Sequence, residues 1–338
     1  MTSDSSAGSA RCRSFPRGHS RLDRRLWWLA PALSVTVLAV GMAVFLVPFR
    51  AWPTDAWTYL AAAERLNAGH TLYALQPGDR PVFTDPASVS VPLLSPPFIA
   101  VLWRPIALMP PEAAVGLWWL GSTLCLATLL ATTSYARPGL GLASTFVFAL
   151  PMAFLAVTGN VNGYLAAGTA TAWWAIHRGR MRLTGVLIAL MAAVKVLPVT
   201  LLLWLLATRR YRAAGWAGLT GAVLLAVSAA GAGIENHGAY LDVIRHTASV
   251  GQSTFSLTGI ALSLGITEAV ARLLPGVALA VGGAVTWVAG RRGHPAGSFT
   301  AAVYTMVWGS PVVNFDWLAL MFAGLGPAFW PVASQSRE

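Results

Sequence analysis

The sequence is short of charged residues. Of its 338 residues, 10% are charged and 56% are hydrophobic, whereas soluble domains usually carry about 25% charged residues. This shortage excludes an ordinary water-soluble globular protein. We therefore expect most of the chain to have lipid as its solvent.

Cysteines and several site motifs are also scarce. The two cysteines are Cys12, near the N-terminus, and Cys125, within an apolar run. They indicate neither a disulfide framework nor a thiolate metal site. The sequence has no glycine-rich phosphate loop, no His–Glu metalloprotease pattern and no serine nucleophile elbow. We therefore expect neither a metal nor a cofactor.

Basic residues, by contrast, are numerous and gather between apolar runs. The formal net charge is +11, which in a soluble protein would suggest a nucleic-acid partner. The clusters are six arginines in the first 25 residues, Arg137, HRGRMR (177–182), RRYR (209–212) and RRGH (291–294). Placing every cluster in the cytoplasm, as the positive-inside rule requires, gives about ten spans with both termini inside.

This topology accounts for the excess charge. The cytoplasmic side then holds 16 basic residues and three acids, and the outer side holds seven basic residues and nine acids. The charge is thus a topology signal, and we expect no nucleic-acid partner. We predict a multi-pass cell-membrane protein with two large outer loops, at about 50–111 and 234–268. Its predicted parts are a disordered basic tail (1–25), one transmembrane domain (26–333) and a short cytoplasmic tail (334–338).

Three predicted hairpins carry polar residues at their tips. They turn at GNVNG (159–163), VKVLP (194–198) and SPVVNFDW (310–317). The legs of the second have about 9–12 residues, or roughly 14–18 Å of helix, against a hydrocarbon core of about 30 Å. Irregular backbone below the surface is tolerated only inside protein or beside a wet cavity. The tip residues expected to line one outward-opening hollow are Asn160, Asn162, Lys195, Asn314 and Asp316.

The stretch TDAWTYLAAAERLN follows the first apolar run, on the predicted outer side. Its pattern predicts a helix with Thr54 as N-cap and Asp55 in the first turn, where the helix dipole favours a carboxylate. Spacing alone therefore explains Asp55 as part of a helix cap. Its position at the membrane boundary, beside the predicted hollow, supports a second hypothesis in which Asp55 is a general base.

The segment VPLLSPPFIAVLWRPIALMPPE (91–112) is apolar but contains six prolines. No straight span survives that pattern. We expect an amphipathic helix here, in the first outer loop, lying on the outer leaflet with Arg104 reaching toward the head groups. It would be either an access wall for a lipid substrate or a plain connector.

Lys195 is the only lysine in the chain. An ionisable residue at membrane depth is a functional candidate, and a lysine is suited to hold a phosphate as a point charge. The alternative is a side chain that snorkels at a helix end. Arg245 and His246, in the second outer loop, are further candidates for the phosphate. Asn314 and Asp316 are candidates to orient a sugar.

Short motifs follow one another in a characteristic order. They are D-x-x-x-Y and G-x-x-x-Y (Asp55, Tyr59, Gly69, Tyr73), then SPPFIAVLWRPIALMP, GNVNG, KVLP and a late SP. From about residue 27 to 330 the chain resembles the integral-membrane mannosyltransferases of glycosyltransferase family 87, in the GT-C superfamily. The family usually has tyrosine where this chain has Ser95, glutamine at Asn160, and a histidine where this chain offers Asn314 to Asp316.

The resemblance implies an all-α polytopic membrane protein with a GT-C-like helix bundle. It implies a polyprenyl-phosphate sugar, usually mannose, as donor and co-substrate. The acceptor would be a glycolipid or lipoglycan on the outer face, with membrane lipids as the remaining partners. Asp55 would be the catalytic base of a single inverting displacement, with Tyr59, Asn160 and Asn162 among the substrate-binding candidates. Lys195 is our first candidate to stabilise the leaving phosphate.

Three alternative hypotheses remain open. The donor would be a polyprenyl-phosphate pentofuranose, such as arabinose, in the first. The second is a lipid or solute transporter, for which inverted repeats and intramembrane charge pairs would be expected. The third is an inactive membrane scaffold.

Overall fold

The computed structural model describes residues 21–46, 53–73, 93–250 and 255–331, with backbone alone for 21–26 and 245–250. These residues form helices and turns, without a strand among them. The longer helices are α1 (Arg21–Leu46), α2 (Thr54–Asn67), α4 (Pro111–Ala136), α5 (Pro138–Thr158), α6 (Asn162–His177), α7 (Met181–Val194), α9 (Tyr211–Ala232), α10 (Ile234–Val250), α13 (Leu274–Arg291) and α14 (Pro295–Trp308). The shorter elements are α3 (Pro97–Trp103), η1 (Ile106–Leu108), η2 (Leu197–Val199), α8 (Thr200–Ala207), α11 (Leu257–Ser263), α12 (Glu268–Ala271), η4 (Phe315–Trp317), α15 (Leu318–Ala323) and α16 (Gly326–Phe329).

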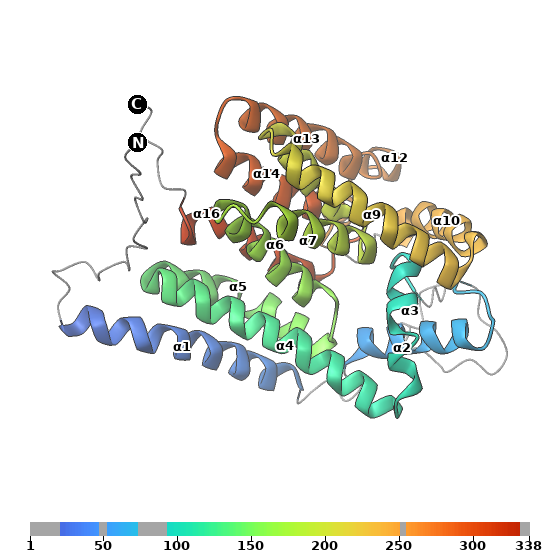
Figure 1. Cartoon of the computed structure of the whole chain (residues 1–338), viewed down its shortest axis with the longest axis horizontal. Coiled ribbons are helices and arrows are strands. Elements are labelled where there is room, and N and C mark those ends of the chain that lie inside the picture. The colour runs from blue at the N-terminus through green and yellow to red at the C-terminus, as the bar shows by residue number, and fades with distance from the viewer. Residues whose placement is uncertain (1–20, 47–52, 74–92, 251–254, 332–338) are drawn as a thin grey trace, which may run out of the picture.

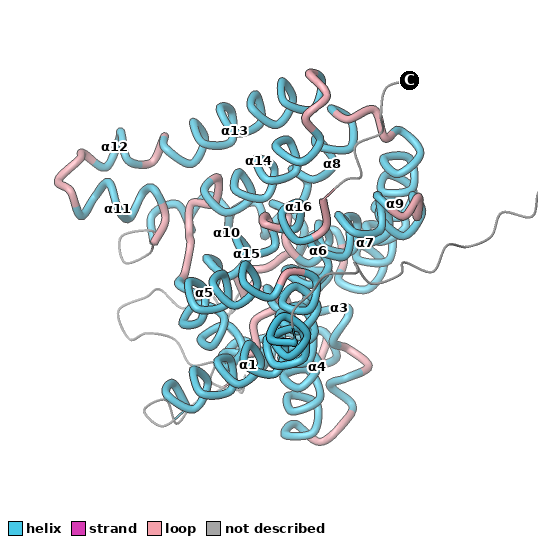
Figure 2. Tube along the Cα trace, turned by 90° about the vertical axis from the view of Figure 1, so that its left-hand side faces the viewer, coloured by secondary structure: helices cyan, strands magenta, loops and turns pink. Residues whose placement is uncertain are grey.

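The helices lie in several groups. Figure 1 shows α1, α4 and α5 side by side along one edge of the molecule and α13 and α14 along the opposite edge. Figure 2, turned by 90°, shows α6, α15 and α16 between these groups. The helices α2 and α3 lie together at one end, in the right-hand part of Figure 1.

Among the described residues, five stretches are long and apolar enough to cross a membrane. They are Trp27–Leu46, Pro111–Ala136, Pro138–Thr158, Tyr211–Ala232 and Glu268–Arg291. The remaining apolar helices are shorter, among them Met181–Val194 and Leu197–Ala207. The all-helical membrane class is thereby confirmed, while the number of about ten spans stays a prediction.

Small residues let α1, α4 and α5 approach closely. A Cβ on Gly41 of α1 would lie 2.7 Å from Ala153 Cβ, too close for two carbon atoms. At the other end of the contact, the buried Ser34 and Ser134 hydroxyls share a 2.6 Å hydrogen bond, and Thr145 donates to Ser34 at 3.2 Å. Close backbone approach and hydroxyl pairs are the usual means of holding helices together in lipid, where burial of apolar surface gives no preference.

The expected bend at Lys195 is confirmed. The helix α7 ends at Val194, and the chain turns through η2 into α8. The start of α7 lies beside the start of α9, since a Cβ on Gly185 would meet the Ala213 carbonyl oxygen at 2.4 Å. The helix α8 therefore runs back toward the end where α7 began, and the two form a hairpin.

The four basic turns consequently lie at one end of the molecule. These turns, α4–α5, α6–α7, α8–α9 and α13–α14, lie toward the N and C labels in Figure 1, away from α2 and α3. This is the arrangement that the charge pattern predicts. Which end faces the cytoplasm stays a prediction.

Both predicted outer loops contain helices. The proline-rich segment forms α3 and η1, as its broken pattern predicts, but Arg104 does not reach outward. Its Nε donates to Asn67 Oδ1 at 2.9 Å and its guanidinium to the Gly231 carbonyl at 2.9 Å. Arg104 therefore joins α2 to α9. The amphipathic character of this segment stays a prediction.

The second outer loop is mostly helical, because α10 and α11 occupy it. Residues 1–20 and 332–338 lie outside the described residues, so Cys12 and most of the predicted tails are not described. The backbone of residues 21–25, which the prediction counted in the disordered tail, is helical and belongs to α1. Cys125 is a free thiol in α4.

Candidate active site

Asp55 lies in the first turn of α2, as expected, but its side chain does not cap the helix. The N-cap position belongs to Pro53, and none of the described side chains caps this end of the helix. The expectation of Thr54 as N-cap is therefore wrong, because Thr54 is itself the first residue of α2. The helix starts one residue earlier than the pattern suggests. The Asp55 Oδ2 atom instead accepts a hydrogen bond of 2.9 Å from Asn160 Nδ2.

A tight turn brings Asn160 to Asp55. The helix α5 ends at Thr158, and the next residue, Gly159, has a left-handed φ of 65°, a conformation that glycine adopts without a Cβ penalty. A Cβ at this position would lie 2.9 Å from Pro53 Cβ. Trp118 Nε1 of α4 also donates to the Gly159 carbonyl at 3.0 Å. Glycine is thus required both for the turn and for its contact with the start of α2.

Asn162 connects the remaining polar groups. Its backbone N–H donates to Asn160 Oδ1 at 2.9 Å, and its Nδ2 donates to Asp316 Oδ2 at 2.9 Å. Its Oδ1 accepts from Lys195 Nζ at 2.8 Å. The five side chains Asp55, Asn160, Asn162, Lys195 and Asp316 form one hydrogen-bonded set, called the polar network below.

The polar network gathers residues from four separate parts of the chain. Helix α2 and the three predicted hairpin tips supply them, as the segment lengths predict. Asn162 and Asp316 are buried, with 0% and 2% exposure, while Asp55 and Lys195 remain partly exposed. Two acids around one lysine form an arrangement that is partly open to a ligand.

Trp317 completes the surroundings of Lys195. The Lys195 Nζ atom lies 3.7 Å from the centroid of the Trp317 ring, a cation–π contact that holds the ammonium group on the indole face. Sequence reasoning missed this residue, although it stands directly after Asp316 in the tip SPVVNFDW.

Burial changes the acidity of Asp55, which lies outside the candidate spans. Loss of solvent raises its pKa to about 6, and the charge of Asp316 acts in the same direction. The hydrogen bond from Asn160 and the charge of Lys195 oppose this rise. A carboxyl group with this pKa is ionised at neutral pH and is a stronger base than an exposed aspartate.

Tyr59 supports the turn beneath the polar network. It is buried between the rings of Trp103 and Trp118, at centroid distances of 6.0 and 5.8 Å. Its hydroxyl oxygen accepts the Val161 N–H at 3.4 Å. The tyrosine therefore contacts the chain between Asn160 and Asn162, and its substrate-binding role stays a prediction.

Of the remaining candidates, Asn314 lies outside the polar network. Asn314 is exposed and holds the start of η4 through its backbone, since its carbonyl accepts the Trp317 N–H at 3.0 Å. Arg245 and His246 belong to α10 by their backbone, and their side chains lie outside the described part of the chain. Their proposed phosphate contacts stay predictions.

An apolar cavity is lined by neighbours of Lys195 in the sequence. Its volume is about 400 Å³, and Ala193 and Val196, on either side of Lys195, line it. The other walls come from α3, α9 and α10. One polar pair lies in the wall: Ser228 Oγ and His237 Nε2 are 3.0 Å apart. Within the described residues, no group of three or more His, Cys, Asp or Glu side chains is suited to a metal ion.

Comparison with known proteins decides the family. The sequence model of glycosyltransferase family 87 matches residues 94–314, which is more than half of the chain. The chain belongs to glycosyltransferase family 87. Asn160, Asn162 and Lys195 lie inside the matched range of this family 87 chain, whereas Asp55 and Asp316 lie outside it.

A relative agrees with this assignment. Over 203 residues the family 87 chain is 28% identical to the polyprenol-phosphate-mannose-dependent alpha-(1-2)-phosphatidylinositol pentamannoside mannosyltransferase of Mycolicibacterium smegmatis. The alignment covers 56% of this chain and 46% of the relative, so the chain spans less than half the length of that enzyme. No solved structure matches the chain.

Proposed function

We propose that this family 87 chain is a membrane glycosyltransferase that moves a sugar, mannose in the first instance, from polyprenyl phosphate to a glycolipid or lipoglycan. The reaction is a single inverting displacement, and it takes place at the polar network, on the extracytoplasmic side. The family assignment and the donor in the relative's name support the class of reaction.

One observation carries the proposal. A partly exposed carboxylate, Asp55, and a partly exposed cation, Lys195, are held in one hydrogen-bonded set by Asn160 and Asn162. A transfer between a hydroxyl group and a sugar phosphate needs a base at one end of the reacting bonds and positive charge at the other. The polar network supplies both.

The displacement transfers one proton, forms one bond and breaks one bond. Asp55 takes the proton of the acceptor hydroxyl while that oxygen forms its bond to the anomeric carbon. The bond from that carbon to the phosphate oxygen breaks, and the oxygen leaves with the electron pair. A carboxylate has about four lone-pair sites, so the hydrogen bond from Asn160 leaves others for the hydroxyl. Lys195 stabilises the negative charge that collects on the departing phosphate.

The apolar cavity suits the lipid part of the donor. Ala193 and Val196 flank Lys195 in the chain and line the cavity, and we propose that the polyprenyl chain of a donor held at Lys195 reaches this cavity. The walls are mainly aliphatic, which matches an isoprenoid chain and not a nucleotide.

The test is transfer by membranes that contain an Asp55→Asn variant. Asparagine keeps the size of the side chain and an oxygen that accepts from Asn160, but it does not take up the proton. We expect transfer from polyprenyl-phosphate mannose to fall by about 10²- to 10⁴-fold, the usual contribution of a general base, with normal expression. The matched control is Glu112→Gln, which removes an acid from the first turn of α4. Wild-type turnover by Asp55→Asn would remove Asp55 from the base role.

The same assay identifies the donor. Polyprenyl-phosphate arabinofuranose and a nucleotide-linked mannose are offered in parallel with polyprenyl-phosphate mannose, each with a panel of lipid acceptors. Transfer from the arabinose donor alone would reject mannose and keep the lipid-linked class. Uptake of a solute into vesicles without any transfer would favour a transporter instead.

A further inference from the structure

A second and larger cavity lies at the end of the molecule opposite Asp55. Its volume is about 940 Å³. The walls come from α1, α4 and α6, and Trp330 closes one side. Its residues belong to the end with the basic turns, since Tyr135 and Ala136 are the last residues of α4 and Trp28 lies near the start of α1.

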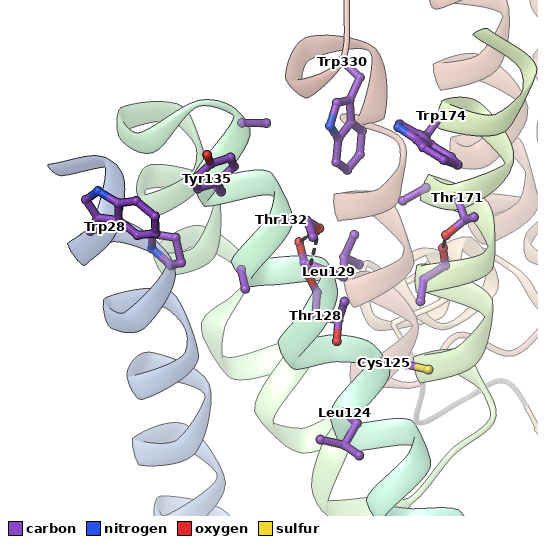
Figure 3. A pocket seen from close by; sticks show the side chains of 15 residues that line it. Trp28, Leu124, Cys125, Thr128, Leu129, Thr132, Tyr135, Thr171, Trp174 and Trp330 are labelled. Carbon is purple, nitrogen blue, oxygen red and sulfur yellow. Dashed lines mark hydrogen bonds between the residues drawn. The ribbon is translucent and has the colours of Figure 1, made fainter. Parts of the chain in front are cut away.

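Four aromatic side chains surround the mouth of this cavity. Figure 3 shows Trp28, Tyr135, Trp174 and Trp330 around the top of the cavity, with Leu124 and Cys125 lower down between the helices. Trp28 and Tyr135 lie at the ends of two candidate spans. Tryptophan and tyrosine prefer the level of the lipid head groups. The mouth of the cavity is therefore at head-group depth, and its floor lies at the depth of the acyl chains.

Two arginines stand at this mouth. The Arg178 and Arg180 guanidinium carbons lie 5.5 and 5.0 Å from the Trp174 ring centroid. Both arginines are exposed, so their donors remain available to an anion. Among the side chains that the structure describes in the four basic turns, no acid is present. The described cations in these turns are Arg137, Arg178, Arg180, Arg182, Arg209, Arg210, Arg212, Arg291 and Arg292.

We infer that this cavity, called the aromatic cavity below, binds an anionic phospholipid of the leaflet at the basic end. An acyl chain fills the space between α1, α4 and α6, and the phosphate lies at Arg178 and Arg180. Guanidinium groups recognise phosphate oxygens through charge-assisted hydrogen bonds, and basic pockets between spans bind acidic head groups. A free phosphate does not account for the apolar volume, so the occupant is a lipid.

The aromatic cavity is separate from the proposed reaction. Asp55 and the polar network lie at the other end of α1 and α4, so a lipid bound here is neither donor nor acceptor in that reaction. Because the lipid occupies the space between α1, α4 and α6, it keeps these helices at their observed spacing. This inference holds whichever sugar the protein transfers.

The experiment is native mass spectrometry of the purified full chain titrated with phosphatidylglycerol and, separately, with phosphatidylcholine of the same acyl chains. We expect one saturable binding site for phosphatidylglycerol and weaker binding of phosphatidylcholine. The double variant Arg178→Ala, Arg180→Ala should weaken phosphatidylglycerol binding by roughly ten- to thirtyfold, from the usual effect of two arginines near an acidic lipid. An excess of inorganic phosphate should displace no lipid.

The matched control is Arg291→Ala, Arg292→Ala. It removes the same charge from the same end of the molecule, and Arg291 likewise stands over a tryptophan, 4.9 Å from the Trp287 centroid. This control should bind phosphatidylglycerol as the wild type does. Equal weakening by both double variants would show general attraction by charge and overturn the inference, as would equal binding of the two lipids.

A second variant tests the acyl-chain part of the inference. Thr128 lies exposed on α4 and lines the aromatic cavity, so Thr128→Trp fills the space without entering the core. We expect the bound lipid to be lost, whereas Leu120→Trp, which also lies exposed on α4 but outside the cavity, should retain it. Retention of the lipid by Thr128→Trp would place the lipid elsewhere and reject the inference.

Discussion

At the scale of single residues, the pair of acids around Lys195 sets the pH response. In the proposed role Asp55 acts only as the carboxylate, and burial together with the charge of Asp316 raises its pKa to about 6. Below that pH the group is protonated and takes up no proton from an acceptor. We therefore expect kcat/KM to be constant near neutral pH and to fall about tenfold per pH unit below about pH 6. A profile that stays flat down to pH 4.5 would contradict this assignment.

An Asp316→Asn variant tests the cause of that shift. Removal of the like charge lowers the pKa of Asp55, so the acidic limb of the profile should move to lower pH. Asparagine keeps an oxygen that accepts from Asn162 Nδ2, which preserves the contact. The measurement is the same pH series on variant and wild type, with the unfolding temperature as a control. An unmoved limb would show that burial alone raises the pKa of Asp55.

The role of Lys195 is tested by Lys195→Met. Methionine retains a long apolar side chain against Trp317 but removes the charge. A hydrogen bond to a charged group contributes about 1.5–3 kcal/mol, so kcat/KM for the donor should fall about 10- to 100-fold. The KM for the acceptor should change little, and Lys195→Arg should recover part of the loss. Donor kinetics like those of the wild type would refute the assignment.

The sequence predicts most of the polar network because polarity at a hairpin tip is a local signal. Asn160, Asn162, Lys195 and Asp316 each interrupt an apolar run, and the short legs of the hairpins bring them toward Asp55. Trp317 carries no such signal, since tryptophan is common in a membrane protein and only the folded structure brings it against Lys195. Arg104 was misjudged for a similar reason. Its partners, Asn67 and Gly231, are distant in sequence.

At the scale of elements, the left-handed turn at Gly159 sets the position of Asn160. A Gly159→Ala variant puts a Cβ into a left-handed conformation, at a cost of about 1–2 kcal/mol, and against Pro53. We expect a lower unfolding temperature and a loss of transfer of about tenfold or more, because a displacement of about 1 Å at a reacting group can cost as much as 10²-fold.

Gly179→Ala is the matched control for that variant. Gly179 has a φ of 71°, with no atom near the position of an added Cβ, and it lies in the basic turn at the opposite end. It should lower the unfolding temperature to a similar degree and leave transfer unchanged. Equal loss of transfer in both variants would show that stability, and not the position of Asn160, limits the reaction.

Element boundaries show where the sequence signal ends. The prolines of the segment 91–112 predict short helical pieces, and α3 and η1 are such pieces. The sequence identifies the segment 234–268 only as a large loop, yet α10 and α11 form there. The polar residues of this segment make its helical pattern hard to recognise. The contacts of α10 with neighbouring elements form only in the folded structure. Asn236 Oδ1 of α10, for example, accepts the Leu72 N–H at 2.8 Å.

At the scale of the whole molecule, the basic turns and the polar network lie at opposite ends of the helix bundle. The positive-inside rule then places the polar network outside. In a chain with Cys12 and Cys125 replaced by serine, we expect a cysteine at Ala68 to react with a membrane-impermeant maleimide on intact cells. A cysteine at His294 should react only after the cells are opened. Both parent residues are exposed. The reverse labelling pattern would invert the topology and end the proposal of an external reaction.

The scarcity of lysine has a practical consequence for the study of this protein. Since Lys195 is the only lysine in the chain, growth on ¹⁵N-labelled lysine introduces one side-chain nitrogen signal, and it comes from the polar network. Its chemical shift during a titration with polyprenyl phosphate would report the ammonium group alone, without assignment of any other resonance.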